Sequence, residues 1–314
     1  MERQLIWGAF VVLLYLLIIG LKALGIIDQY TTNNLVLAGI YVILGVSLNL
    51  INGFTGQFSI GHAGFMSIGA YFGAIATVKF GLPFALALLM GGLVAALAGM
   101  LIGLPTLRLR GDYLAIATLG FGEIIRVVFL NWEYVGGARG FSVPRLTNFT
   151  WVYVIAVLTV VIIRNWVQSA HGRACIAVRE DEVAASAMGI NTTLYKVIAF
   201  SVGAAFAGIA GALYAHYFFL IAPHSFGFLR SVEVLIIVVL GGLGSISGSV
   251  IAAILLTGLS MLLANWPYPR LIIYSLTLIG IMIYRPGGLM GMREIALPIS
   301  FIKKKGEERQ LGAS

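Results

Sequence analysis

The sequence predicts an all-α fold, a polytopic membrane bundle of about ten transmembrane segments that includes broken or re-entrant helices. Three observations support this prediction. Hydrophobic residues make up 60 % of the 314-residue chain and charged residues only 10 %, against about a quarter charged in soluble domains. Apolar runs of about 20 residues, long enough to cross a bilayer, recur along the chain. These runs are continuous and not alternating, which favours helices over a β-barrel.

We interpret residues 1–314 as one transmembrane domain. Glu2 and the length of the first apolar run favour an uncleaved helix over a signal peptide. The run 229–263 is too long for one crossing and holds a glycine cluster, so two shorter helices are expected there. The candidate spans are 5–25, 34–51, 63–79, 83–104, 113–130, 151–167, 197–220, 229–263 and 271–285.

The net charge of +8 is read here as a topology signal. The basic residues gather at the ends of the apolar runs, and their distribution favours a cytoplasmic N-terminus. If 229–263 crosses once, the basic tail 286–314 lies on the same side. A nucleic-acid partner is therefore not expected, whereas the tail suits anionic lipid.

Motifs for catalysis or metal binding are absent from the sequence. It contains no phosphate loop, which excludes ATP binding by that device, and no His-Glu-x-x-His motif. Cys175 is the only cysteine and the four histidines are scattered, so neither an internal disulfide nor a metal site is expected. We therefore expect no catalytic residue and no enzyme activity.

Two stretches rich in glycine and serine, 52–64 and 241–248, interrupt the apolar pattern. Paired helix breaks often mark a transport path, because freed backbone groups are tolerated only against protein or a water-filled cavity. For the glycines, close helix packing is the alternative. For Gln57 and His62, lining a cavity and supporting a loop are both open. The candidate path or break residues are Gly53, Thr55, Gly56, Gln57, Ser59, Gly61, His62, Gly242, Gly244, Ser245 and Gly248.

A charged segment, about 171–195, lies between two apolar runs on the predicted cytoplasmic side. Its acids suit the first turn of a short helix over about 179–188, and Gly189 suits the left-handed residue that ends it. The helix could lie on lipid, but adjacent acids are repelled by anionic headgroups, which favours docking into a protein groove. The candidate contact residues are Arg173, Arg179, Glu180, Asp181, Glu182, Ala185, Met188 and Gly189.

Two further features concern the spans and the opposite face. Glu123 with Arg126, and Arg230 with Glu233, are each three residues apart and can form structural ion pairs on a helix. No chain of buried acids and lysines crosses the membrane, which disfavours an ion-driven pump. The polar loop 131–150 on the outer face suits either an interfacial aromatic belt or the docking of an external partner.

Several segments resemble LivM-type permease subunits of ABC importers for branched-chain amino acids. The resemblance covers most of 34–291 in order, with one departure at Ser249, where the family favours proline. The segments that resemble the family are Gly53-Phe-Thr-Gly-Gln-Phe-Ser-Ile-Gly-His-Ala-Gly-Phe65, Leu107-Arg-Leu-Arg-Gly-Asp-Tyr-Leu-Ala-Ile-Ala-Thr-Leu-Gly120, Gly172-Arg-Ala, Arg179-Glu-Asp-Glu-Val-Ala-Ala, Met188-Gly-Ile-Asn191, Phe200 with Ala207-Gly-Ile-Ala-Gly-Ala212, Val238-Val-Leu-Gly-Gly-Leu-Gly-Ser-Ile-Ser-Gly248 and Tyr284-Arg-Pro-Gly-Gly-Leu289.

The resemblance implies a permease in the bacterial inner membrane with both termini in the cytoplasm. It implies no cofactor on this chain, because ATP and Mg²⁺ would bind two cytoplasmic ATPase subunits. It also implies a second homologous permease, an external (periplasmic) substrate-binding protein, and a coupling role for the charged segment against an ATPase. Urea and short-amide importers use similar permeases, so the cargo stays open. The residues also leave open an ion-coupled transporter of a small polar solute and a structural subunit of a respiratory complex.

Overall fold

The computed structural model describes residues 2–25, 27–106, 109, 111–263, 273, 276, 279–280, 283–284 and 287–291. These residues form a helical bundle with one pair of two-residue antiparallel strands, β1 (Phe141–Ser142) and β2 (Leu220–Ile221). The α-helices are α1 (Glu2–Ala23), α2 (Gln29–Asn49), α3 (His62–Val78), α4 (Phe84–Thr106), α5 (Asp112–Asn131), α6 (Phe149–Gln168), α7 (Ala170–Glu180), α8 (Glu182–Ala187), α9 (Thr192–Phe218), α10 (Phe228–Gly241) and α11 (Ile246–Leu262). A π-helical turn (Leu50–Phe54) extends α2, and three short 3₁₀ turns span Glu133–Val135, Gly137–Arg139 and Pro223–Phe226.

Within the described residues, six helical stretches are long and apolar enough to cross a membrane. Three shorter apolar helices accompany them, within 11–22, 62–78 and 246–262. The chain is thus a multi-pass membrane protein, while the total of about ten segments stays a prediction. Only isolated residues of the expected last span, 271–285, are described, and the tail beyond residue 291 lies outside the described residues. The six stretches are Gln29–Phe54, Phe84–Thr106, Asp112–Asn131, Phe149–Gln168, Thr192–Phe218 and Pro223–Gly241.

Helix α9 forms the centre of the bundle, where it packs against α3 and α4, while α2 packs against α6, α9 and α11. Small residues allow the close approach. A Cβ added to Gly69 would lie 2.0 Å from the carbonyl oxygen of Gly208, and one added to Gly211 would lie 1.9 Å from that of Met66. Glycine at such crossings lets two backbones touch, as is common between membrane helices.

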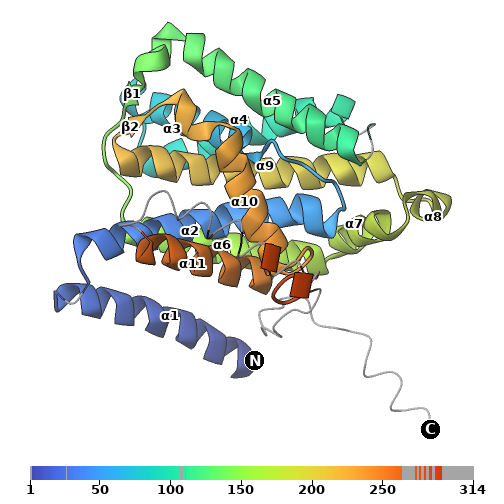
Figure 1. Cartoon of the computed structure of the whole chain (residues 1–314), viewed down its shortest axis with the longest axis horizontal. Coiled ribbons are helices and arrows are strands. Elements are labelled where there is room, and N and C mark those ends of the chain that lie inside the picture. Colours follow the sequence, from blue (N-terminus) through green and yellow to red (C-terminus); the bar gives the residue numbers. More distant parts are fainter. Residues whose placement is uncertain are drawn as a thin grey trace.

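The bundle has two distinct ends (Figure 1). Helices α7 and α8 project from one end, beyond the start of α9 and the end of α2. Strands β1 and β2 lie at the opposite end, together with the loop that joins α5 to α6. This loop folds onto the bundle, because Val143 N donates to the carbonyl oxygen of Phe219 at 2.7 Å and Trp132 stacks on Phe129 with ring centroids 5.9 Å apart.

Several local predictions are confirmed. The apolar run 229–263 is two helices, α10 and α11, separated at the glycine cluster. The expected ion pairs form, with Glu123 and Arg126 2.6 Å apart and Arg230 and Glu233 2.9 Å apart. Gly189 has a positive φ of 83° after the end of α8, as a left-handed helix terminus requires.

The short helix expected over about 179–188 forms as α8, but its predicted start at Arg179 is wrong. Arg179 and Glu180 close α7, and a new helix, α8, begins at Glu182. Asp181 between them is extended, with φ −155° and ψ 111°. Its carboxylate accepts hydrogen bonds from Val183 N at 2.8 Å and Ala184 N at 3.0 Å. This N-cap competes with helix continuation and divides the segment in two.

Candidate functional site

The two glycine-rich breaks meet in the structure. The first break, 50–61, comprises the π-helical turn after α2 and the extended chain that returns to α3. The second break, 242–245, connects α10 to α11. A Cβ added to Gly53 would lie only 2.3 Å from the backbone nitrogen of Gly244. The two breaks therefore touch through their backbones, and only glycine fits at residue 53.

Asn49 joins the breaks through its side chain. It is fully buried at the end of α2. Its Nδ2 donates to the carbonyl oxygen of Ser245 at 2.7 Å and to Oγ of Ser249 at 2.8 Å, while its Oδ1 accepts from Gly244 N at 2.8 Å. A broken helix frees such backbone groups, and apolar surroundings demand that they be paired. Ser249, the departure from the family pattern, is thus part of the network.

The polar side chains of the first break mostly satisfy backbone groups nearby. Asn52 and Ser59 bond reciprocally, because Asn52 Nδ2 donates to Ser59 O and Ser59 N donates to Asn52 Oδ1, both at 3.2 Å. Thr55 Oγ1 donates to Leu50 O at 2.9 Å. The buried ring of His62 is 2.8 Å from Ser47 Oγ through Nε2. These side chains hold the break in one shape.

The start of α3 packs closely against α5. A Cβ added to Gly61 would lie 2.2 Å from the carbonyl oxygen of Thr118, and Ile60 N donates to Thr118 Oγ1 at 3.1 Å. At the second break, Ser245 caps α11 by accepting from Gly248 N at 3.1 Å. Both breaks are thus tightly packed in this conformation.

Arg179, near the end of α7, lies against both breaks. Its Nη1 donates to the carbonyl oxygen of Gly53 at 2.9 Å, and its side chain also pairs with Glu180. A Cβ on Gly244 would lie 3.0 Å from the same Nη1. A Cβ on Gly56, whose φ is +70°, would lie 2.9 Å from Arg179 Cγ. One side chain of the charged segment therefore touches both helix breaks.

A second route connects α8 to the first break. Glu182 forms a 2.6 Å ion pair with Lys196 of α9. The carbonyl oxygen of Lys196 accepts from Gln57 Nε2 at 3.1 Å. Gln57 is almost completely buried, so this bond fixes the first break to the base of α9.

The remaining predicted residues of the charged segment lie farther from the breaks. Arg173 donates to the carbonyl oxygen of Gln168 at 2.8 Å. Ala185 is a buried residue of α8, whereas Val183 and Met188 are 69 % and 83 % exposed. A large exposed apolar side chain at the end of a membrane bundle is typical of a contact surface.

The sequence alone did not identify two residues that the structure makes functional candidates, Asn49 and Lys196. Asn49 follows a long apolar run, and one polar residue there gives no sign of its partners. Lys196 directly precedes the expected span 197–220, and a basic residue at the end of a span indicates topology without indicating a specific partner. In the described part of the chain, no three His, Cys, Asp or Glu side chains come together in a way that could hold a metal ion.

Cys175 reports on the packing of α7 against the first break. Its side chain is buried, and burial raises the pKa of its thiol to about 11, opposed by a smaller effect of its hydrogen bond with Thr55. Alkylation requires the thiolate. We therefore expect very slow reaction with N-ethylmaleimide at pH 7, followed by a rise of about tenfold per pH unit that continues above pH 9.

Mass spectrometry of the folded permease at stepped pH would measure this profile, with the unfolded chain as control. In the unfolded chain the rate should level off near the ordinary cysteine pKa of about 8.5. Fast alkylation of the folded protein at pH 7 would contradict the close packing of α7 on Thr55.

Comparison with known proteins places these features in a wider group. Residues 30–285 match the family model described as the permease component of the branched-chain amino acid transport system. The chain is 39 % identical to the high-affinity branched-chain amino acid transport system permease protein LivM of Salmonella typhimurium, over 86 % of this chain and 72 % of the relative. It is 37 % identical to LivM of Escherichia coli, over 94 % of this chain and 78 % of the relative. It is 27 % identical to the permease protein LivH of Escherichia coli, over 85 % of this chain and 96 % of the relative. No solved structure matches the chain.

Proposed function

This chain belongs to the family of permease components of branched-chain amino acid ABC transport systems, and we propose that it couples ATP hydrolysis on partner subunits to movement of its two helix breaks. As a transporter subunit it is not an enzyme, and its family carries no cofactor on the permease. Because the chain belongs to this family, we no longer consider it an ion-coupled transporter or a structural subunit of a respiratory complex.

In this proposal, α7 and α8 dock on a cytoplasmic ATPase subunit through the exposed residues of the charged segment. Val183 and Met188 supply apolar contact area, and Arg173, Glu180 and Gly189 border it. Asp181 and Ala185 keep α8 in shape through its cap and its packing. A rigid helix pair that carries a protein contact at one end and touches the helix breaks at the other can transmit displacement.

The observation that carries the proposal is the position of Arg179. Its guanidinium bonds to Gly53 of the first break and lies against Gly244 of the second. Movement of α7 would therefore displace both breaks together. The ion pair of Glu182 with Lys196, continued by Gln57, adds a parallel connection from α8. Separation of the breaks would free the backbone and side-chain groups that line a transport path.

We propose the partners and the location by analogy with the same family. Similarity to both LivM and LivH relatives supports pairing with a second, homologous permease. Two ATPase subunits would bind the α7–α8 end, and an external substrate-binding protein would bind the β1–β2 end. In this proposal the chain lies in the bacterial inner membrane with both termini in the cytoplasm. The cargo proposed is a branched-chain amino acid, with urea or a short amide as the alternative.

Replacing Arg179 with glutamine tests the coupling proposal. We expect the variant to fold and to retain its ATPase subunits, because Val183 and Met188 are unchanged. Uptake per ATP hydrolysed should fall about tenfold, the size of effect expected when one charge-assisted hydrogen bond is lost. The measurement is leucine uptake and phosphate release by the same proteoliposomes.

Lys22→Gln is the matched control for this experiment, because it removes a positive charge from an exposed residue at the end of α1. Its uptake per ATP should equal that of the unmodified complex. An Arg179→Gln complex with unchanged coupling would show that α7 does not act through this side chain.

A further inference from the structure

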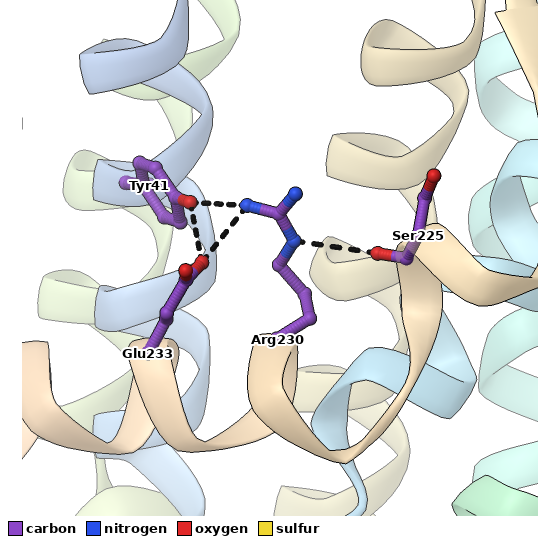
Figure 2. A network of polar contacts seen from close by, with 4 residues as sticks. All are labelled: Tyr41, Ser225, Arg230 and Glu233. Atoms are coloured by element: carbon purple, nitrogen blue, oxygen red, sulfur yellow. Dashed lines mark hydrogen bonds and ion pairs between the residues drawn. The ribbon is translucent and has the colours of Figure 1, made fainter. Parts of the chain in front are cut away.

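A second polar cluster lies between α2 and α10 (Figure 2). Nη1 of Arg230 donates to Glu233 Oε2 at 2.9 Å and also to the hydroxyl of Tyr41. Tyr41 in turn donates to the same Oε2 at 2.8 Å. Nε of Arg230 bonds to the carbonyl oxygen of Ser225 at 3.4 Å. The cluster joins one positive and one negative side chain within helices that are long and apolar enough to span a membrane.

This cluster lines a cavity of about 420 Å³ between α2, α9, α10 and α11. Its volume lies within the range of about 300–1,000 Å³ that is usual for small-molecule sites. The cavity combines the charged pair with aliphatic side chains from three of the helices: Leu37, Ile236, Ile237 and Leu256. Its wall is therefore charged in one region and apolar in another.

The charged pair leaves bonding capacity unused. In the part of the chain that the structure describes, the hydrogen bonds of this pair use Nε and Nη1 of Arg230 and Oε2 of Glu233, and none uses Nη2 or Oε1. The side chains of Arg230 and Glu233 are 21 % and 41 % exposed, so both can be reached from outside. Ionisable groups within membrane spans are costly, and those with open bonding capacity are typical of functional sites.

We infer that this cavity binds the zwitterion of a branched-chain amino acid during its passage, an inference that rests on the function proposed above. The carboxylate accepts from Arg230, and the ammonium donates to Glu233. The aliphatic side chain packs against Leu37, Ile236 and Leu256. Arg230 and Glu233 carry opposite charges, which complement the two charges of a zwitterion. Urea and simple amides carry neither charge. The cavity therefore also distinguishes between the two proposed classes of cargo.

The chain contains a matched control for the charged pair. Glu123 and Arg126 of α5 form an ion pair with the same three-residue spacing, 2.6 Å long. Neither residue lines the cavity of about 420 Å³. Glu123 Oε1 also accepts from Phe228 N at the start of α10, at 3.0 Å, and the amide oxygen of glutamine can keep this bond. Glu123→Gln therefore removes a charge from a membrane helix and leaves the lining of the proposed site unchanged.

Equilibrium dialysis of tritiated leucine tests the inference. The permease is purified with its partner subunits and assayed without nucleotide or binding protein. We expect saturable binding by the unmodified complex and by Glu123→Gln, and binding at least about tenfold weaker by Glu233→Gln and Arg230→Gln. Unlabelled 4-methylpentanoate and 3-methylbutylamine, which each keep one charge of leucine, should compete at least about tenfold more weakly than leucine.

A size variant keeps the test decisive if the charge variants fail to fold. Leu37→Trp fills the cavity and leaves the ion pair in place, so it too should lose leucine binding. Three results would overturn the inference. The first is unchanged leucine binding by Leu37→Trp, and the second is equal binding by Glu233→Gln and the unmodified complex. The third is the absence of saturable leucine binding by the unmodified complex.

ATP-driven uptake separates this inference from the proposed function. If the unmodified complex takes up leucine in the presence of ATP and its binding protein but shows no binding that depends on Arg230, the cavity is not the site and the proposed function stands. If the same complex shows no ATP-driven leucine uptake, the proposed function itself fails.

Discussion

Replacement of Asn49 by leucine is expected to abolish uptake and to lower the free energy of unfolding by several kcal/mol. The leucine side chain fills a similar volume but loses the bonds of Asn49 to Ser245 O, Ser249 Oγ and Gly244 N. Ser249 Oγ still donates to Ser245 O at 3.1 Å, so the largest loss is at the buried Gly244 N. Each buried polar group left without a partner costs about 1–3 kcal/mol. Apolar surroundings also provide little water to replace the lost bonds.

Thermal unfolding of the purified protein and leucine uptake in proteoliposomes measure the two effects. Asn131→Leu is the matched control, because Asn131 is an asparagine at the end of α5 whose Nδ2 bonds only to Val127 O of its own helix, at 2.8 Å. Asn131→Leu should change the midpoint temperature of unfolding only slightly. Equal stability and uptake of the Asn49 and Asn131 variants would mean that the second break does not depend on the amide of Asn49.

The location of the helix breaks could be predicted from the sequence because glycine clusters end apolar patterns locally. The split between α10 and α11 followed directly from such a cluster. The split between α7 and α8 did not. Arg179 to Glu182 contains residues that suit a helix interior and an acid that suits a cap, and only the folded backbone shows that Asp181 is the cap.

The contact between the breaks was beyond prediction from this sequence. Asn49 and Gly244 are 195 residues apart, and Arg179 and Gly53 are 126 apart. Neither pair follows the periodicity of a helix, which relates only residues three or four apart. The sequence therefore identified Arg179 as a candidate in the charged segment and Gly53 as a candidate in the first break. Only the tertiary structure shows that the two residues are in contact.

This joint geometry gives the breaks a specific mechanical property. Gly53 contributes its carbonyl oxygen to Arg179 and lies against the backbone of Gly244. The same position thus receives any displacement of α7 and passes it to the second break by direct contact. Cores and interfaces that are packed in this way tend to have discrete arrangements and do not deform continuously. Position 53 should therefore tolerate little added volume.

Replacement of Gly53 by alanine is expected to destabilise the permease and to remove most uptake. The new Cβ would lie 1.9 Å from Asn49 Oδ1 and 2.3 Å from Gly244 N, distances that no real contact allows. The two breaks must then move apart, which also disturbs the bond from Arg179. Overpacking of a close contact costs about 1–3 kcal/mol. Gly120→Ala is the control, because in the described part of the chain no atom beyond its own stretch of α5 lies within 4 Å of its added Cβ, and alanine favours the helix.

A double-mutant cycle identifies the cause of the Gly53 effect. The shortest clash is with the side chain of Asn49, so Asn49→Ala removes it while the contact with Gly244 N stays. Both single variants should unfold at lower temperature, and the loss in the double variant should be smaller than their sum. Simple additivity, or a Gly53→Ala protein as stable and active as Gly120→Ala, would show that the two breaks do not touch at this position in the working permease.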